Sequence, residues 1–215
     1  MGVALHEAGA LIDLYRPYLD GVLPARGSFD ALVVFGGEQN ARDDDLHPYL
    51  PALAELMAVE SAAGGAVMGI CLGSQIMARG AGAQNILSAA TEFGWCEVRL
   101  SAAAKHDPLF STLPERFSIF QWHSDTFTLP DGAVHLATSQ KAAIQAFRLG
   151  PRAYATQFHF EASTAVVADW SATFPDLIAG IDPDWAKTHS MRAQTEGMQA
   201  DRIGLSLARG WVAMI

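Results

Sequence analysis

The chain has 215 residues, of which 50% are hydrophobic and 17% are charged. This composition excludes a disordered chain, and the length suits one α/β domain, so we expect residues 1–215 to form a single domain. The formal net charge of −9 argues against a general surface for nucleic acid or anionic membranes. Two cysteines are too few for a disulfide framework and suit a reducing cytosol.

No stretch of the sequence has the pattern of a secretion signal or of a membrane span. The first ten residues include His6 and Glu7 and lack an apolar core. The longest uncharged run, residues 61–78, approaches the length of a span, but its glycines and polar residues fit a strand, a turn and a helix better. We therefore expect a cytoplasmic protein with no membrane partner.

The N-terminal part predicts the end of a helix followed by two strands. Residues through about Ala10 are typical of a helix end, and Leu11–Tyr15 is a short candidate strand. Phe29–Phe35 is largely apolar, as expected of a strand buried on both faces. The glycine turn Gly36-Gly37-Glu38-Gln39-Asn40 follows at its carboxyl end.

Three consecutive carboxylates then precede a helix that begins near a proline. They are Asp43, Asp44 and Asp45, and the helix has leucines at helical spacing from Leu50 onward. A metal site is one interpretation of such a cluster. Acidic residues before a helix also favour its dipole without any ion, so we expect no metal here.

The most informative stretch runs from Ala66 to Arg79. It combines a short apolar strand, a cysteine between glycines, and a helix with apolar residues at helical spacing. A residue between such a strand and helix lies on a sharp turn, the geometry of a nucleophile elbow. Gly69 and Gly73 remove side chains that would crowd this turn, and a helix N-terminus favours the thiolate form of Cys71. The alternative is that Cys71 is a small buried hydrophobe.

A second stretch, Tyr154–Glu161, supplies the partners that a thiol nucleophile needs. It is an apolar run ending in His159, with Glu161 two residues further on. A nucleophile requires a base, and the base requires a group that fixes its tautomer. However, His123 and Asp125 have the same arrangement at the end of another candidate strand. The residues alone do not decide between the two pairs.

Further strands and helices complete the prediction. We expect strands at 92–100, 117–122, 133–138, 143–148 and 154–158, and helices at 163–172, from Pro183 with Asp182 as its cap, and at 199–212. The last three strands are separated by turns too short for helical crossovers, so some of these pairs should be antiparallel. Cys96 should lie on the packed side of its strand and be inert.

Two motifs resemble those of the class I (triad-type) glutamine amidotransferases. They are Gly-Ile-Cys-Leu-Gly-Ser-Gln at 69–75 and Gln-Phe-His-Phe-Glu at 157–161. The run Gln-Trp-His-Ser-Asp at 121–125 is similar to stand-alone members related to the amidotransferase domain of GMP synthetase. The resemblance extends from about residue 10 to the C-terminus. It fails at Phe160, where the family usually has proline, and at the N-terminus, where the family's first buried strand is not evident.

The resemblance implies a flavodoxin-like α/β fold, in which a mostly parallel sheet with a small antiparallel extension has helices on both faces. It implies no metal and no cofactor. The site residues that it implies are the triad Cys71, His159 and Glu161, the oxyanion-hole N–H groups of Gly37 and Leu72, and the substrate-side residues Gln75, His123, Ser124 and Asp125.

The function that the resemblance implies is hydrolysis of the glutamine side-chain amide to glutamate and ammonia through a thioester, with an unidentified ammonia acceptor. One alternative is a stand-alone hydrolase of γ-glutamyl peptides or amides, because these 215 residues include no synthetase domain. Another is a non-catalytic binding or regulatory subunit with the same fold. The partners expected are glutamine or a γ-glutamyl compound, with a separate synthetase subunit and homo-oligomerisation left open.

Overall fold

A mixed sheet of seven strands forms the centre of the computed structural model, which describes all residues 1–215. Its strand order is β1-β2-β9-β8-β7-β4-β5, and a separate small sheet pairs β3 with β6. The strands are β1 (Ala31–Val34), β2 (Ala66–Ile70), β3 (Asn85–Ile86), β4 (Glu92–Leu100), β5 (Arg116–His123), β6 (Thr126–Phe127), β7 (Val134–Thr138), β8 (Ala146–Leu149) and β9 (Ala153–Thr156).

The direction of the strands corrects one expectation. Only β1, β2 and β9 run parallel to one another, whereas the other four pairings in the large sheet are antiparallel. The sheet is therefore mixed and not mostly parallel. The cause is the shortness of the connections between β7, β8 and β9, which cannot hold the crossover that a parallel pair needs. The expected antiparallel pairing among these strands is confirmed.

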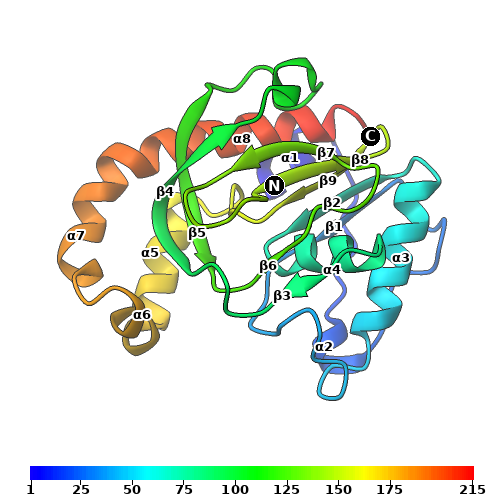
Figure 1. Cartoon of the computed structure of the whole chain (residues 1–215), viewed down its shortest axis with the longest axis horizontal. Coiled ribbons are helices and arrows are strands. Elements are labelled where there is room, and N and C mark those ends of the chain that lie inside the picture. The colour runs from blue at the N-terminus through cyan, green and yellow to red at the C-terminus, as the bar shows by residue number, and fades with distance from the viewer.

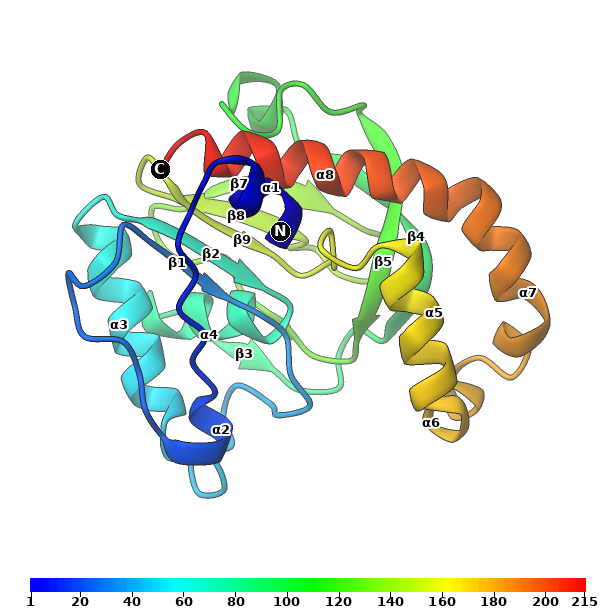
Figure 2. The same cartoon turned by 180° about the vertical axis from the view of Figure 1, so that it is seen from behind.

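Helices cover both faces of the sheet, as expected (Figures 1 and 2). α3 (Leu50–Ala62) and α4 (Leu72–Gly80) lie on one face, and the long α8 (Met198–Val212) with the short α1 (Gly2–Glu7) lies on the other. α5 (Thr164–Thr173), α6 (Pro175–Ile181) and α7 (Trp185–Arg192) gather beside β4 and β5. The remaining helical segments are α2 (Pro17–Asp20), a 3₁₀ turn (Ala103–His106) and a π-helical turn (Ala193–Gly197). No helix has both the length and the apolar character that a membrane crossing requires.

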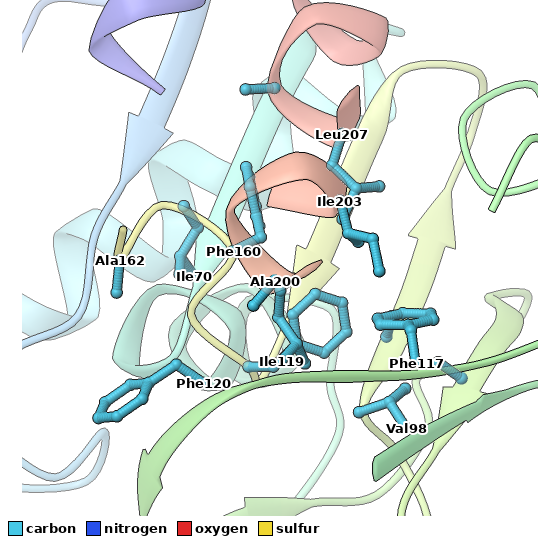
Figure 3. Packing of buried hydrophobic residues seen from close by; sticks show 14 of the residues in the cluster. Ile70, Val98, Phe117, Ile119, Phe120, Phe160, Ala162, Ala200, Ile203 and Leu207 are labelled. Carbon is cyan, nitrogen blue, oxygen red and sulfur yellow. The ribbon is translucent and has the colours of Figure 1, made fainter. Parts of the chain in front are cut away.

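Two apolar cores hold these layers together. In the core under α8, Ile203 and Leu207 point toward Ile119 and Phe117 of β5 (Figure 3). The other core lies under α3 and α4 and includes Leu50, Leu53, Leu56 and Met57, whose spacing predicted that helix. The two cores pack on opposite faces of the central strands β2 and β9, whose residues are all buried. This packing fixes the positions of the ends of these strands.

The N-terminal region differs from the prediction. Residues 11–15 form no strand, and Leu11 is fully exposed. β1 is shorter than the predicted run 29–35 and only partly buried, because it is the edge of the sheet and pairs only with β2. The expectation of a strand buried on both faces is therefore wrong for β1, and no strand precedes it in the chain.

The C-terminal helices are mostly as predicted. α5 begins after Ser163, whose hydroxyl accepts a hydrogen bond from the Val166 N–H, and α8 matches the predicted 199–212. The helix expected from Pro183 begins instead at Trp185, with Asp184 as its first flanking residue. Asp182 accepts a hydrogen bond from the Asp184 N–H, so its carboxylate stabilises the turn before the helix and does not cap the helix itself.

Candidate active site

Cys71 lies on a strained turn between β2 and α4. Its backbone angles, φ 53° and ψ −111°, fall in a region that residues other than glycine rarely occupy. Hydrogen bonds hold the turn on both sides: the Cys71 N–H donates to the Thr156 carbonyl at 2.8 Å, and the Cys71 carbonyl accepts from Ser74 N–H at 2.9 Å. The thiol is thereby fixed at the carboxyl end of the parallel strands, as the elbow pattern predicts.

Two glycines allow α4 to approach the sheet this closely. A methyl group on Gly69 would lie 2.5 Å from the Gly73 carbonyl oxygen. A methyl group on Gly73 would collide with the Val34 carbonyl group of β1. The first turn of α4 therefore packs directly on the backbone of β1 and β2, which confirms the packing role expected for both glycines.

His159 reaches Cys71 from the segment that follows β9. The His159 N–H donates to the Phe120 carbonyl at 2.8 Å, which ties this segment to β5. The imidazole Nδ1 lies 2.7 Å from Glu161 Oε1. Since a carboxylate only accepts hydrogen bonds, Nδ1 carries a proton and Nε2 is the nitrogen free for proton transfer.

Gly36 marks the point where the thiol and the imidazole meet. A methyl group built on Gly36 would lie 3.1 Å from His159 Cε1, 3.3 Å from Cys71 Cβ and 3.7 Å from Cys71 Sγ. Both side chains therefore contact the same small residue at the end of β1. Phe160, which replaces the proline usual in the family, is buried in the core under α8 and leaves the contact between His159 and Glu161 intact.

The charges at this site favour a protonated imidazole. Burial alone would lower the pKa of His159, but the Glu161 carboxylate and the Cys71 thiol together hold the pKa well above its ordinary value. Glu161 Oε2 is buried and has no hydrogen-bond partner in the protein. The arrangement is that of a thiol, a base and an orienting acid, which suits nucleophilic catalysis.

The second histidine–acid pair has a different geometry. His123 Nδ1 lies 3.0 Å from the Asp125 backbone carbonyl, while the Asp125 carboxylate accepts a hydrogen bond from the Ser88 N–H at 2.8 Å. Asp125 therefore does not orient the imidazole with its side chain. The other imidazole nitrogen, Nε2, faces the buried carboxylate of Glu92 at 3.3 Å.

The segment that carries His123 still borders the thiol. The Cys71 thiol lies 3.7 Å from the carbonyl oxygen of Trp122 and can donate to it. Ser124 is exposed, and its carbonyl accepts a hydrogen bond from the Ala90 N–H. Residues 122–125 therefore form a wall beside Cys71 that is tied to the start of β4.

The remaining predicted residues also lie around Cys71. Leu72 is the first residue of α4, where an N–H group has no acceptor within the helix. A methyl group on Gly37 would lie 3.3 Å from Leu72 Cδ2, so the Leu72 side chain lies close to Gly37. Gln75 is buried one helical turn further on, and its Nε2 donates to Gln157 Oε1 at 3.2 Å.

Comparison with known proteins places the chain in a family. The model described as Glutamine amidotransferase class-I matches residues 5–168, a range that includes Cys71, His159 and Glu161. The chain belongs to the class I glutamine amidotransferases. It is 33% identical over 165 residues to the glutamine amidotransferase-like protein YfeJ of Salmonella typhimurium, covering 75% of this chain and 69% of YfeJ.

Other relatives are larger, and solved structures share the fold. The chain is 30% identical over 133 residues to the glutamine-hydrolyzing GMP synthase of Thermotoga sp. strain RQ2, a match to 61% of this chain but only 24% of that protein. A glutamine amidotransferase structure from Thermotoga maritima superimposes with a TM-score of 0.80 at 26% identity, covering 100% of this chain and 90% of that one. One from Methylobacillus flagellatus gives 0.85 at 25% identity, covering 98% and 86%.

The candidate site includes residues that the sequence analysis missed. Glu92 is a buried carboxylate beside His123, and Trp170 packs edge-on against His159 with ring centroids 5.4 Å apart. An acidic residue at the start of an apolar strand was the only signal for Glu92. Its contact depends on the register of β4 and β5, which places Glu92 directly opposite His123. The sequence holds no comparable signal for Trp170.

Two other predicted features of the chain have structural explanations. Asp44 makes two hydrogen bonds of 2.6 Å to the guanidinium of Arg79, which lowers the pKa of Asp44. The acidic cluster thus contributes an ion pair that ties its loop to the end of α4.

Cys96 is half-buried, and this burial raises the pKa of its thiol to about 11, so it stays protonated and unreactive.

Proposed function

We propose that this protein hydrolyses the side-chain amide of glutamine, with Cys71 as nucleophile, His159 as acid and base, and Glu161 as the group that orients His159. The observation that carries the proposal is that two side chains meet at Gly36. One is the thiol of Cys71, which stands on a strained backbone turn, and the other is the imidazole of His159, which is bound to a carboxylate. Each of the three groups has the neighbour that its role requires. The raised pKa of His159 further supports an imidazole paired with a thiolate.

In the proposed reaction the Cys71 thiolate attacks the amide carbon and a C–S bond forms. We assign the N–H groups of Gly37 and Leu72 the role of stabilising the negative charge on the oxygen of the tetrahedral intermediate. His159 gives its proton to the departing nitrogen, the C–N bond breaks, and ammonia leaves behind a thioester. A water molecule then gives a proton to His159 as it attacks the thioester, and glutamate leaves while the thiolate–imidazolium pair is restored.

The rest of the pocket would bind the amino-acid end of the substrate. We assign this role to Gln75, His123, Ser124 and Asp125, which lie on the first turn of α4 and on the wall beside it. The ammonia acceptor is unassigned. The GMP synthase relatives support a partner of the synthetase type, because their names combine glutamine hydrolysis with synthesis.

A second candidate function is hydrolysis of γ-glutamyl amides that carry an apolar amine. The observation that favours it is the aromatic surroundings of the site. Trp170 contacts both His159, with ring centroids 5.4 Å apart, and Trp122, with centroids 5.7 Å apart, and Phe174 contacts Trp122. Because His159 protonates the departing nitrogen, an apolar substituent on that nitrogen would lie near these rings.

One assay separates the two functions. The protein is incubated with L-glutamine or with L-γ-glutamyl-4-nitroanilide, and the release of glutamate is measured for the wild type and for Cys71→Ala. We expect the wild type to release glutamate from glutamine and the Cys71→Ala variant to be inactive. Activity only on the anilide would favour the second candidate, and equal activity of the wild type and Cys71→Ala would contradict both.

A further inference from the structure

A chain of buried side-chain amides starts at Glu92, a residue that the proposed reaction does not use. Glu92 lies at the first position of β4 and is 5% exposed. Its Oε2 accepts hydrogen bonds from the Ser139 hydroxyl and from Gln145 Nε2, each at 2.7 Å. A carboxylate inside a protein needs such donors, because burial without them is costly. Glu92 is therefore a buried hydrogen-bond acceptor with a fixed set of donors beside the candidate site.

This acceptor sets the direction of the amides next to it. A carboxylate only accepts hydrogen bonds, so Gln145 must present its NH2 group to Glu92 and its oxygen to the other side. Gln145 Oε1 accepts from Gln121 Nε2 at 2.9 Å, which leaves the Gln121 oxygen as the next acceptor. Gln121 and Gln145 are fully buried, and Gln121 Oε1 has no partner in the protein.

A second pair of amides, at the pocket, has the same direction. Gln75 Nε2 donates to Gln157 Oε1, and Gln157 Nε2 is buried without an acceptor. Gln145 contacts both pairs. Its backbone carbonyl accepts a hydrogen bond from the Gln157 backbone N–H at 2.8 Å, while its side chain binds Gln121. The free donor of Gln157 and the free acceptor of Gln121 are complementary, and the backbone hydrogen bond from Gln157 to Gln145 joins the two pairs.

We propose that Glu92 is a positioning residue that orients the side chain of Gln75 through Gln145, Gln121 and Gln157. Each amide directs its NH2 group toward Glu92 and its oxygen toward the pocket. Gln75 is the last amide of the chain and so presents its oxygen to the substrate. That oxygen accepts a hydrogen bond from the α-ammonium group, so the site selects amides of α-amino acids over the same amides without the amino group.

This proposal rests on the proposed function of the Cys71 pocket, and its first test is substrate selectivity. The substrates are L-glutamine and glutaramate, which has the same amide and carboxylate but no α-amino group. We expect Glu92→Gln to reduce the preference for glutamine about tenfold, the order of one hydrogen bond to a charged group. The loss should appear as a higher KM for glutamine, with little change in kcat. An unchanged preference and an unchanged KM would overturn the proposal.

Two further variants separate the relay from other roles of Glu92. Gln157→Met breaks the chain next to Gln75 and leaves the contacts of Glu92 with His123 intact, so we expect the same loss of preference from it. This variant also keeps the test open if Glu92→Gln does not fold. Glu97→Gln is the matched control, because Glu97 is an exposed carboxylate on the same strand, and it should behave as the wild type.

A spectroscopic measurement decides the relay without relying on activity. In NMR spectra of side-chain amides, we expect Glu92→Gln to shift the signals of both Gln145 and Gln75, and Glu97→Gln to shift neither. Unchanged Gln75 signals in Glu92→Gln would overturn the relay. A wild type that hydrolyses neither substrate would contradict the proposed function alone, while these spectra would still decide the relay.

Discussion

At the residue scale, the chemistry depends on how three neighbours set the position and the pKa of the His159 imidazole. Glu161 holds Nδ1 at 2.7 Å, Cys71 lies on the other side, and Gly36 provides the space in which the thiol and the imidazole meet. Burial by itself would favour the neutral imidazole, yet the two acidic neighbours outweigh it and raise the pKa of His159. The titration of this one histidine therefore reports on the whole triad.

Replacing either neighbour should lower the pKa of His159. Cys71→Ser removes the thiolate and Glu161→Gln removes the carboxylate, so each variant loses one group that favours the imidazolium. NMR titration of the imidazole signals measures the change directly. A pKa of His159 that is the same in the wild type and in both variants would contradict the site described above.

The same pKa shift predicts how stability depends on pH. Because the pKa of His159 is higher in the folded chain than in the unfolded chain, protonation favours the folded state. The stabilisation is complete below the unfolded value of about 6.5 and is lost as the pH rises through the folded value. In urea unfolding at a series of pH values, the stability of the wild type relative to His159→Gln should therefore decrease over that range. A difference that grows with pH would contradict the sign.

The sequence predicted the residues of the triad but not all of their surroundings. His159 and Glu161 stand two residues apart in one motif, so their spacing along the chain also sets their contact in the fold, whereas the parallel pairing of β2 with β9 brings Cys71 to His159. Glu92 faces His123 only because β4 and β5 pair in one register, and a register cannot be derived from either strand alone. For the same reason, the residues alone left the two histidine–acid pairs undecided.

At the scale of elements, the decisive contact is the packing of α4 on β1 and β2. Gly73 touches the backbone of Val34, so the first turn of the helix has no space for a side chain there. This contact holds Cys71 in its strained conformation and brings Leu72 next to Gly37. The elbow is thus a property of three elements together, which explains why both glycines are needed.

Adding one methyl group to this contact should be costly. Gly73→Ala places the new carbon against the Val34 carbonyl, which is backbone and cannot rotate away, so we expect a loss of about 1 to 3 kcal/mol. Gly180→Ala is the control, because Gly180 lies in α6 with open space around it. Urea unfolding compares the two. Equal stability of both variants would show that α4 does not pack as closely as described.

The types of the elements were easier to predict than their arrangement. Apolar spacing identified α3, α4, α8 and the strands β4, β5, β7, β8 and β9, since that spacing reflects burial of one face, whereas the two-residue β6 was not predicted. The proportion of antiparallel pairs was underestimated, because it depends on which strands become neighbours. α6 was not predicted. α7 begins later than expected, because the Asp182 carboxylate stabilises a turn and the helix starts only after that turn.

For the whole molecule, both cores reach the elbow. The core under α3 and α4 contains Leu72 and Ile76 of the elbow helix, whereas the core under α8, on the opposite face of the sheet, includes Cys71 (Figure 2). Leu207 is buried in the core under α8, whereas the turn at Cys71 is held by backbone hydrogen bonds to Thr156 and Ser74. Stability and reactivity should therefore be separable by mutation.

A truncation under α8 tests this separation. Leu207→Ala should lower the free energy of unfolding by about 2 to 5 kcal/mol, the usual cost of a large-to-small change in a core. The reactivity of Cys71 with a glutamine analogue should remain that of the wild type at temperatures where the variant is folded. A loss of reactivity in the folded variant would mean that packing under α8 also sets the geometry of the elbow.

The central claim is that Cys71 is a working nucleophile in a pocket shaped for glutamine. The most direct test is intact-mass analysis after incubation with a glutamine analogue that carries an electrophile at the γ position, for the wild type and for Cys71→Ala. We expect one adduct on the wild type and none on the variant. A folded wild type that forms no adduct, while a general thiol reagent still labels Cys71, would contradict the claim.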